Sequence, residues 1–401
     1  MVDKAYEILL LNQISPLGLE RFPADIYRLS RDADRPHAIL VRSQDMHAMN
    51  IPDSVRAIGR AGAGTNNIPV KMLSGRGVPV FNAPGANANA VKELVLAGML
   101  IAARNIGPAL AFINGLAMDG SARDDAVLSR RIEAEKKAFA GFELPGHTLG
   151  VIGLGRIGSL VADTAIKLGM NVLGYDPDIT VDAAWSLPAQ VKKAQSIEEV
   201  MKNAHFITLH VPLVDRTRNL IDADLLGLAR KGAVLLNFSR DGIVDAAAVR
   251  EALSDGRLNG YVTDFPVSAL AAIPGVIALP HLGASTREAE DNCAIMVVDQ
   301  VRDFLQDGNV RNAVNFPDVF MARESPYRIA VANANVPNMV GQVTGKLASA
   351  GLNIHNMLNR SRADMAYTLA DVDSAVDDTV IGAIAAIPGV LGVRYLPLRE
   401  E

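Results

Sequence analysis

Three side chains that together suit hydride-transfer chemistry follow consecutive apolar segments in the second half of the chain. Arg240 follows residues 233–238, Asp264 ends a run that starts at residue 260, and His281 comes shortly after residues 276–279. Side chains at the carboxyl ends of neighbouring parallel strands meet at one edge of a sheet. A histidine titrates near neutral pH and can take a hydroxyl proton, and a guanidinium offers two parallel donors to a carboxylate. Each residue alone is more often a turn or surface residue, so their predicted proximity carries the hypothesis.

A glycine-rich turn upstream indicates the cofactor. Gly153, Gly155 and Gly158 stand between an apolar run and a helical segment, and the next apolar run stops at Asp176, eighteen residues past Gly158. Glycines in this pattern permit a tight turn, close approach of a pyrophosphate and helix packing, and the acidic residue takes the ribose hydroxyls. A carboxylate repels a 2′-phosphate, which favours NAD over NADP. The residues predicted to bind NAD here are Gly153, Gly155, Arg156, Ile157, Gly158 and Asp176.

Composition narrows the class of protein. The 401 residues have a net charge of -5, 49% hydrophobic side chains and one cysteine, Cys293. No basic excess points to nucleic acid, and no signal peptide or membrane-spanning run of about 18 apolar residues is evident. A single cysteine in an apolar helical run predicts a buried structural thiol, no disulfide and no metal site. We expect a cytoplasmic protein with no nucleic-acid or membrane partner.

The elements that must position these side chains divide the chain into domains. Six apolar segments separated by helices predict a doubly wound parallel sheet of the Rossmann type. Residues 1–90 alternate short strands and helices, and a capping box at 285–288 followed by a strand-like run at 309–316 predicts a return to that first domain. We therefore expect an α/β fold in which a nucleotide-binding domain, 91–285, is inserted in a smaller substrate domain made of 1–90 and 286–316. The six segments are 148–152, 171–175, 205–211, 233–238, 260–264 and 276–279.

The last part of the chain forms a further predicted unit. Residues 317–326 contain two prolines and several charges and indicate a linker. Residues 327–401 show strand and helix patterns in the order βαββαβ, which is typical of a ferredoxin-like fold. This unit is too small for a second catalytic core, so a regulatory or oligomerisation role is expected.

Longer motifs then follow one another as in a known family. Residues 60–68, 80–87, 153–158, 210–212, 237–245 and 280–286 resemble the D-isomer-specific 2-hydroxyacid dehydrogenases, over nearly all of residues 5–316. Residues 335–337 and 351–354 resemble an ACT domain. The combined resemblance implies NAD-dependent oxidation of 3-phospho-D-glycerate to 3-phosphohydroxypyruvate, the first step of L-serine biosynthesis.

The resemblance also implies roles for individual residues. Arg240 would bind the substrate carboxylate and carbonyl, His281 would be the general acid/base, and Asp264 would hold the nicotinamide carboxamide. The phosphorylated substrate would face Arg42, Ser43, Arg60 and Asn82, with the two arginines as phosphate ligands. Further cofactor contacts are implied for His210, Pro212 and Gly283.

Two departures from the family pattern bear on these roles. The glutamate expected four or five residues beyond Asp264 to pair with His281 is absent, and Ser268 or a residue from elsewhere in the chain would orient the imidazole instead. In family members that serine inhibits, the effector lies between paired ACT domains, against asparagines that match Asn335 and Asn353. In this chain Asn333 replaces a histidine of that pattern and Asn338 replaces a glycine. The resemblance thus implies L-serine only as a hypothetical effector, with Asn333, Asn335 and Asn353 as its candidate ligands.

Other functions stay open at this point. Another D-2-hydroxyacid dehydrogenase or a glyoxylate/hydroxypyruvate reductase would use the same scaffold. A scaffold or regulatory protein that senses NAD without turnover is the alternative of a different class. For assembly we expect a homodimer or a homotetramer.

Overall fold

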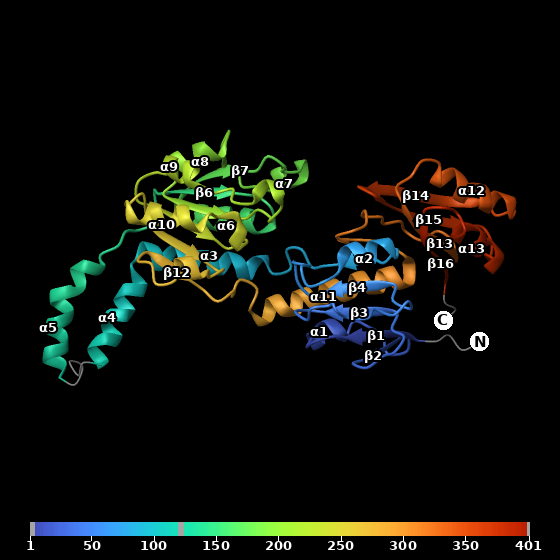
Figure 1. Ribbon diagram of the computed structural model, residues 1–401, viewed down its shortest axis with the longest axis horizontal. Helices are drawn as coiled ribbons and strands as arrows, with labels where there is room; N and C mark the ends of the chain where they lie inside the picture. Colours follow the sequence, from blue (N-terminus) through green and yellow to red (C-terminus); the bar gives the residue numbers. More distant parts are fainter. Residues whose placement is uncertain (1–4, 119–123, 399–401) are drawn as a thin grey trace. The chain divides into compact units, whose positions relative to one another are not determined.

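The computed structural model describes residues 5–118 and 124–398, which divide into two compact units (Figure 1). Unit 1 comprises residues 1–87 and 287–401, and unit 2 comprises residues 88–286. The chain thus leaves unit 1 after residue 87 and returns to it at residue 287.

Unit 2 contains the nucleotide-binding sheet. Its seven parallel strands lie in the order β12-β11-β10-β9-β6-β7-β8, so the order reverses beside β6, where a doubly wound sheet binds its ligand. The strands are β6 (Thr148–Ile152), β7 (Asn171–Tyr175), β8 (Lys192–Lys193), β9 (Phe206–Leu209), β10 (Ala233–Asn237), β11 (Leu258–Thr263) and β12 (Val276–Ala278). The six predicted segments are confirmed, and β8 is an additional edge strand.

Helices cover both faces of this sheet because its strands are apolar on both sides. One core contains α3 (Ala88–Ala103) and α6 (Arg156–Lys167). The other contains α8 (Ile197–Asn203), α9 (Ala223–Leu228) and α10 (Ala246–Ser254). Side chains of Ser196, Asp222 and Asp245 cap the first turns of these last three helices, which fixes where each begins.

A helical arm extends from unit 2 (Figure 1). It consists of α4 (Ile106–Met118), α5 (Asp125–Glu135) and the short 3-10 helix Lys136–Phe139. The sequence predicts a helix over residues 122–140, and the first residues of that range lie outside the described residues. Among the described helices none alone is long and apolar enough to cross a membrane, although α3 and α4, bent by 67°, pass that test as a pair.

Unit 1 combines two sheets. The first is parallel, in the order β2-β1-β3-β4-β5, and is flanked by α1 (Pro16–Leu19), α2 (Val70–Gly75) and the 21-residue α11 (Arg287–Asp307). Its strands are β1 (Tyr6–Leu10), β2 (Tyr27–Ser30), β3 (Ala38–Val41), β4 (Ala57–Arg60) and β5 (Val80–Phe81). Cys293 on α11 is 4% exposed, which confirms the buried thiol.

The second sheet of unit 1 has the ferredoxin-like arrangement that the sequence predicts. Its antiparallel strands lie in the order β14-β15-β13-β16, with two helices packed against one face. The elements are β13 (Tyr327–Ala334), α12 (Met339–Ser349), β14 (Ile354–Arg362), β15 (Met365–Val372), α13 (Asp378–Ala385) and β16 (Val390–Pro397).

A common core joins the two sheets of unit 1. Ala330, Tyr367 and Leu396 of the second sheet belong to the same buried cluster as Phe81 and Phe304. The segment expected to be a linker contributes to this packing, because Val319 is fully buried and pairs with Val310, and Met321 is 5% exposed. Residues 317–326 therefore connect the sheets as a packed segment rather than as a free tether.

Candidate active site

The glycine turn of unit 2 has the geometry of a phosphate cradle. Gly153 has φ +92, and a Cβ at that position would come within 2.6 Å of the His210 carbonyl oxygen. A Cβ on Gly158 would come within 1.9 Å of the Gly153 carbonyl oxygen, so α6 packs where only glycine fits. By contrast a Cβ on Gly155 would meet open space, and Gly155 starts α6 without a side-chain cap. The N–H groups of the first turn, with Arg156 and Ile157, are therefore open to an anion.

Asp176 lies at the end of the neighbouring strand, beside this turn. Its Oδ2 accepts the Leu154 N–H at 2.8 Å and its Oδ1 accepts the Asp178 N–H at 3.0 Å. These bonds fix the carboxylate while leaving lone pairs for ribose hydroxyls. Arg216 pairs with Asp178 in an exposed ion pair, and the Asp176 carboxylate beside the turn repels a 2′-phosphate. The residues present fit NAD.

His210 follows β9 and stays neutral. Its Nε2 lies 2.9 Å from the Thr208 hydroxyl, and burial lowers the pKa of the imidazole to about 3. Its buried Nδ1 has no hydrogen-bond partner among the described residues, which makes it available to a ligand at this edge. The Pro212 carbonyl accepts a bond from Thr217 at 2.6 Å and so helps to fix the loop after His210.

Arg240 and His281 approach the same aromatic ring. The Arg240 guanidinium lies 5.8 Å from the centre of the Phe265 ring, and the His281 ring packs edge-on against it at 4.9 Å. Both side chains are exposed. Residues that follow β10, β11 and β12 thus gather around Phe265 at the carboxyl edge of the sheet.

Asp264 anchors the histidine loop. The carboxylate is 2% exposed, and its two oxygens accept the Leu282 and Gly283 N–H groups at 2.7 and 2.8 Å. The Asp264 carbonyl also accepts the His281 N–H at 3.1 Å. His281 has φ +58, a left-handed conformation that non-glycine residues rarely adopt. These three bonds hold the loop in that conformation.

The arginine loop has its own anchors, which the sequence analysis did not single out. Buried Asn237 donates to the Arg240 carbonyl at 2.8 Å and accepts the Ser239 N–H at 3.1 Å, while the Ser239 hydroxyl donates to the Leu209 carbonyl. Asn237 also lies 3.3 Å from the Tyr261 hydroxyl, whose pKa is raised by burial. A polar residue at the end of an otherwise apolar strand was the available signal.

Ser268 does not take the place of the missing glutamate. No hydrogen bond or ion pair within residues 5–118 and 124–398 joins Ser268, or any carboxylate, to the His281 ring. The ring's contact is the Phe265 edge. In the described chain the histidine is therefore positioned by packing and by its backbone.

The four candidate substrate ligands of unit 1 also come together at one sheet edge. Arg42 and Ser43 follow β3, Arg60 ends β4 and Asn82 follows β5. Arg60 donates from Nε to the Arg42 carbonyl at 3.0 Å, and Asn82 donates to the Ala63 carbonyl at 2.5 Å. The Arg42 guanidinium is 2.6 Å from the Glu290 carboxylate on α11, a pair that the sequence analysis did not foresee.

The candidate effector asparagines do not meet within one chain. Asn333 is 1% exposed and Asn335 follows the end of β13, whereas Asn353 precedes the start of β14. Because Ala334 pairs with Met365 and Met365 with Arg362, the end of β13 lies at the end of β14, opposite Asn353. A ligand shared by Asn335 and Asn353 requires a second copy. Asn338, where a glycine was expected, has φ +61, which asparagine tolerates.

Known proteins similar to this chain share one family. A family model described as "D-isomer specific 2-hydroxyacid dehydrogenase, NAD binding domain" matches residues 110–283. D-3-phosphoglycerate dehydrogenase of Haemophilus influenzae is 30% identical over 352 residues, 85% of this chain and 81% of that protein. The enzyme of the same name from Methanocaldococcus jannaschii is 34% identical over 80% of this chain, which spans only 59% of that longer relative.

A solved structure supports the fold. NAD+-bound 3-phosphoglycerate dehydrogenase of Entamoeba histolytica has a TM-score of 0.59 and 22% identity, covering 79% of this chain and all of that one.

Proposed function

The chain belongs to the D-isomer specific 2-hydroxyacid dehydrogenases, which use NAD, and we propose that it oxidises 3-phospho-D-glycerate to 3-phosphohydroxypyruvate at the start of L-serine biosynthesis. Two similar proteins bear the name D-3-phosphoglycerate dehydrogenase, and the cradle of unit 2 fits NAD.

The cofactor is held by residues of unit 2. The open first turn of α6 receives the pyrophosphate, Asp176 takes the ribose hydroxyls, and the unpartnered Nδ1 of His210 is offered to the ligand. Pro212 and Gly283 line the same edge. Bound NAD supplies the hydride acceptor.

Arg240 and His281 act on the hydroxy acid. The guanidinium binds the substrate carboxylate and the oxygen that becomes a carbonyl, because it offers parallel donors and a permanent charge. The His281 imidazole takes the hydroxyl proton as the hydride leaves the carbon that bears this hydroxyl, and it returns the proton in the reverse reaction. Asp264 fixes the loop that carries this imidazole, and a contact of Asp264 with the nicotinamide carboxamide remains a prediction.

The phosphate group is assigned to the arginines of unit 1. Arg42 and Arg60 adjoin each other at the ends of β3 and β4, with Ser43 and Asn82 beside them. A dianion competes with Glu290 for Arg42, since that exposed ion pair contributes little energy.

The observation that supports this function most is the cluster of Arg240, Phe265 and His281 beside the glycine cradle. The test is NADH formation by the purified chain from 3-phosphoglycerate, D-lactate, D-glycerate and D-2-hydroxyglutarate. The proposal requires the highest kcat/KM with 3-phosphoglycerate. Faster reaction with an unphosphorylated acid identifies another dehydrogenase of the family.

A regulatory protein without turnover is the second candidate, favoured by the absent carboxylate partner of His281. NAD binding without NADH formation from any of these acids would establish it.

We further propose a cytoplasmic homodimer or homotetramer, in which paired ferredoxin-like units bind L-serine between Asn335 of one copy and Asn353 of another. A calorimetric titration that shows no heat with L-serine would exclude L-serine as an effector.

A further inference from the structure

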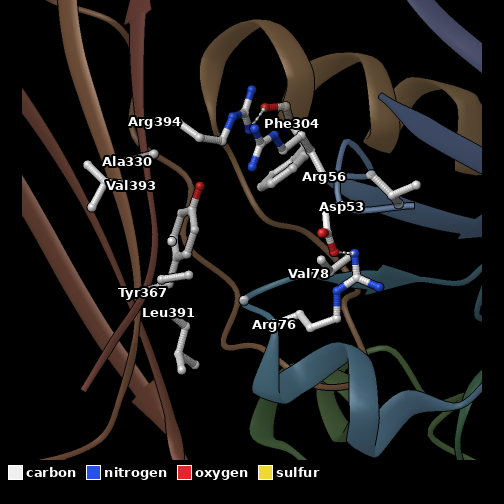
Figure 2. A pocket seen from close by; sticks show the side chains of 14 residues that line it. Asp53, Arg56, Arg76, Val78, Phe304, Ala330, Tyr367, Leu391, Val393 and Arg394 are labelled. Atoms are coloured by element: carbon white, nitrogen blue, oxygen red, sulfur yellow. Dashed lines mark hydrogen bonds and ion pairs between the residues drawn. The ribbon is translucent and has the colours of Figure 1, made fainter. Parts of the chain in front are cut away.

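A cavity lies in unit 1, between its two sheets (Figure 2). It has a volume of about 260 Å³. Its walls come from the turns around β4 and α2, from α11, and from the ferredoxin-like sheet. The polar side chains that line it are Asp53, Arg56, Arg76, Tyr367 and Arg394.

The cavity carries more positive than negative charge. Arg76 is fully engaged, because it pairs with Asp53 at 3.1 Å and donates to the Ile51 and Pro52 carbonyls at 2.8 Å. Arg56 and Arg394 have no carboxylate partner among the described residues. Two guanidinium groups therefore remain uncompensated, and Figure 2 shows them at one end of the cavity beside Phe304.

Arg394 is partly neutralised by dipoles rather than by a charge. It donates to the Phe304 and Leu305 carbonyls at the end of α11, at 2.9 and 2.7 Å, and its guanidinium lies 4.5 Å from the Phe304 ring centre. Burial lowers the pKa of Arg394, and the charge of nearby Arg56 lowers it further. A partly buried cation without a counter-charge loses hydration free energy, which a bound anion offsets.

The remaining walls suit a small organic ion. Val78, Leu391 and Phe304 are apolar, and the Tyr367 hydroxyl, whose pKa is raised by burial, donates to the Gly308 carbonyl at 2.8 Å. Gly77 permits the two walls to approach closely, because a Cβ there would come within 3.1 Å of the Leu391 backbone. Apolar walls with two cations at one end match an anion that has a short carbon chain.

We propose that this cavity binds a small organic anion, a carboxylate or a phosphate ester of about three or four carbons, through Arg56 and Arg394. The site is separate from the residues assigned to catalysis and does not depend on the proposed substrate. Arg394 links it to α11, the helix that begins six residues after His281 in the sequence.

The test is calorimetric titration of the full chain with inorganic phosphate and, separately, with malonate. In a chain that carries Arg42→Gln and Arg240→Gln, and so lacks two arginines assigned to the substrate, at least one probe should still bind once per chain. Adding Arg56→Gln should weaken that binding about tenfold or more, which is at least 1.4 kcal/mol. Arg56→Glu should abolish binding by placing a carboxylate in the cavity. Arg28→Gln, a change of an exposed arginine outside the cavity, should leave binding unchanged.

The probes distinguish the two sources of negative charge. Binding of phosphate alone assigns a phosphate ester, and binding of malonate alone assigns a carboxylate. The Arg56 side chain is exposed and, within the described chain, has no hydrogen-bonded partner, so its variants should fold normally by circular dichroism. Absence of binding at millimolar concentrations, equal affinity in Arg56→Gln, or loss of binding in Arg240→Gln or Arg42→Gln would overturn the proposal.

Discussion

Replacement of Asp264 by asparagine tests how the histidine loop is held. The carboxylate is 2% exposed and accepts the Leu282 and Gly283 N–H groups at 2.7 and 2.8 Å. The amide retains one acceptor and turns an NH2 group toward the other buried N–H. Because a hydrogen bond to a charged group contributes about 1.5–3 kcal/mol and an unpaired buried donor adds its desolvation cost, we expect the free energy of unfolding to fall by about 2–4 kcal/mol.

The same change should impair turnover more than substrate binding. His281 keeps φ +58 only while its loop is fixed, and a displacement of about 1 Å lowers kcat roughly 100-fold. Steady-state kinetics and urea unfolding would be measured beside Asp255→Asn, which alters an exposed carboxylate that also accepts a backbone N–H, that of Arg257. Asp255→Asn should change stability by less than about 0.5 kcal/mol. If Asp264→Asn keeps both the stability and the kcat of the unmodified chain, the anchoring role is refuted.

Three further predictions concern other groups of the site. Phe265→Leu removes the ring that contacts His281 and Arg240, so kcat should fall about 3- to 10-fold, and an unchanged kcat would contradict that packing role. Arg42→Gln should raise the KM for 3-phosphoglycerate about tenfold or more and leave that for D-glycerate unchanged; equal effects on both acids would exclude a phosphate ligand. Burial lowers the pKa of His210 in the folded chain to about 3, from its ordinary value of 6.5, so the unfolded chain binds the extra proton and stability decreases as the pH drops below 6.5. Urea unfolding should show that the free energy of unfolding is lower by roughly 2 kcal/mol at about pH 5 than at pH 7, and that His210→Gln lacks this difference. An identical decrease in the variant would contradict the role of His210.

The nucleotide-binding sheet was predictable because its strands are continuous apolar runs that stop at glycine or polar residues. Strand β8 was missed since it has two exposed lysines at the sheet edge and no apolar pattern. The capping box at 285–288 marked the start of α11 to within a few residues, because helix N-termini have local chemical signals.

Contacts between distant segments could not be predicted in the same way. Arg328 and Asp371 form a fully buried ion pair at 2.6 Å, yet they are 43 residues apart and neither has a local signature. Residues 317–326 indicated a linker by their prolines and charges, but the burial of Val319 and Met321 depends on neighbours elsewhere in the chain. The contact of His281 with Phe265 instead of Ser268 likewise depends on side-chain direction, which spacing does not specify.

The most direct test of the proposed chemistry is the rate of NADH formation from 3-phosphoglycerate by the unmodified chain and by His281→Ala. General acid–base catalysis contributes about 10²–10⁴-fold, so the unmodified chain should form NADH with saturation kinetics and the variant should have a kcat at least 100-fold lower. NAD affinity should be the same in both, because His281 is not assigned to the cofactor. Near-full activity in the variant, or no NADH from the unmodified chain, would contradict the account.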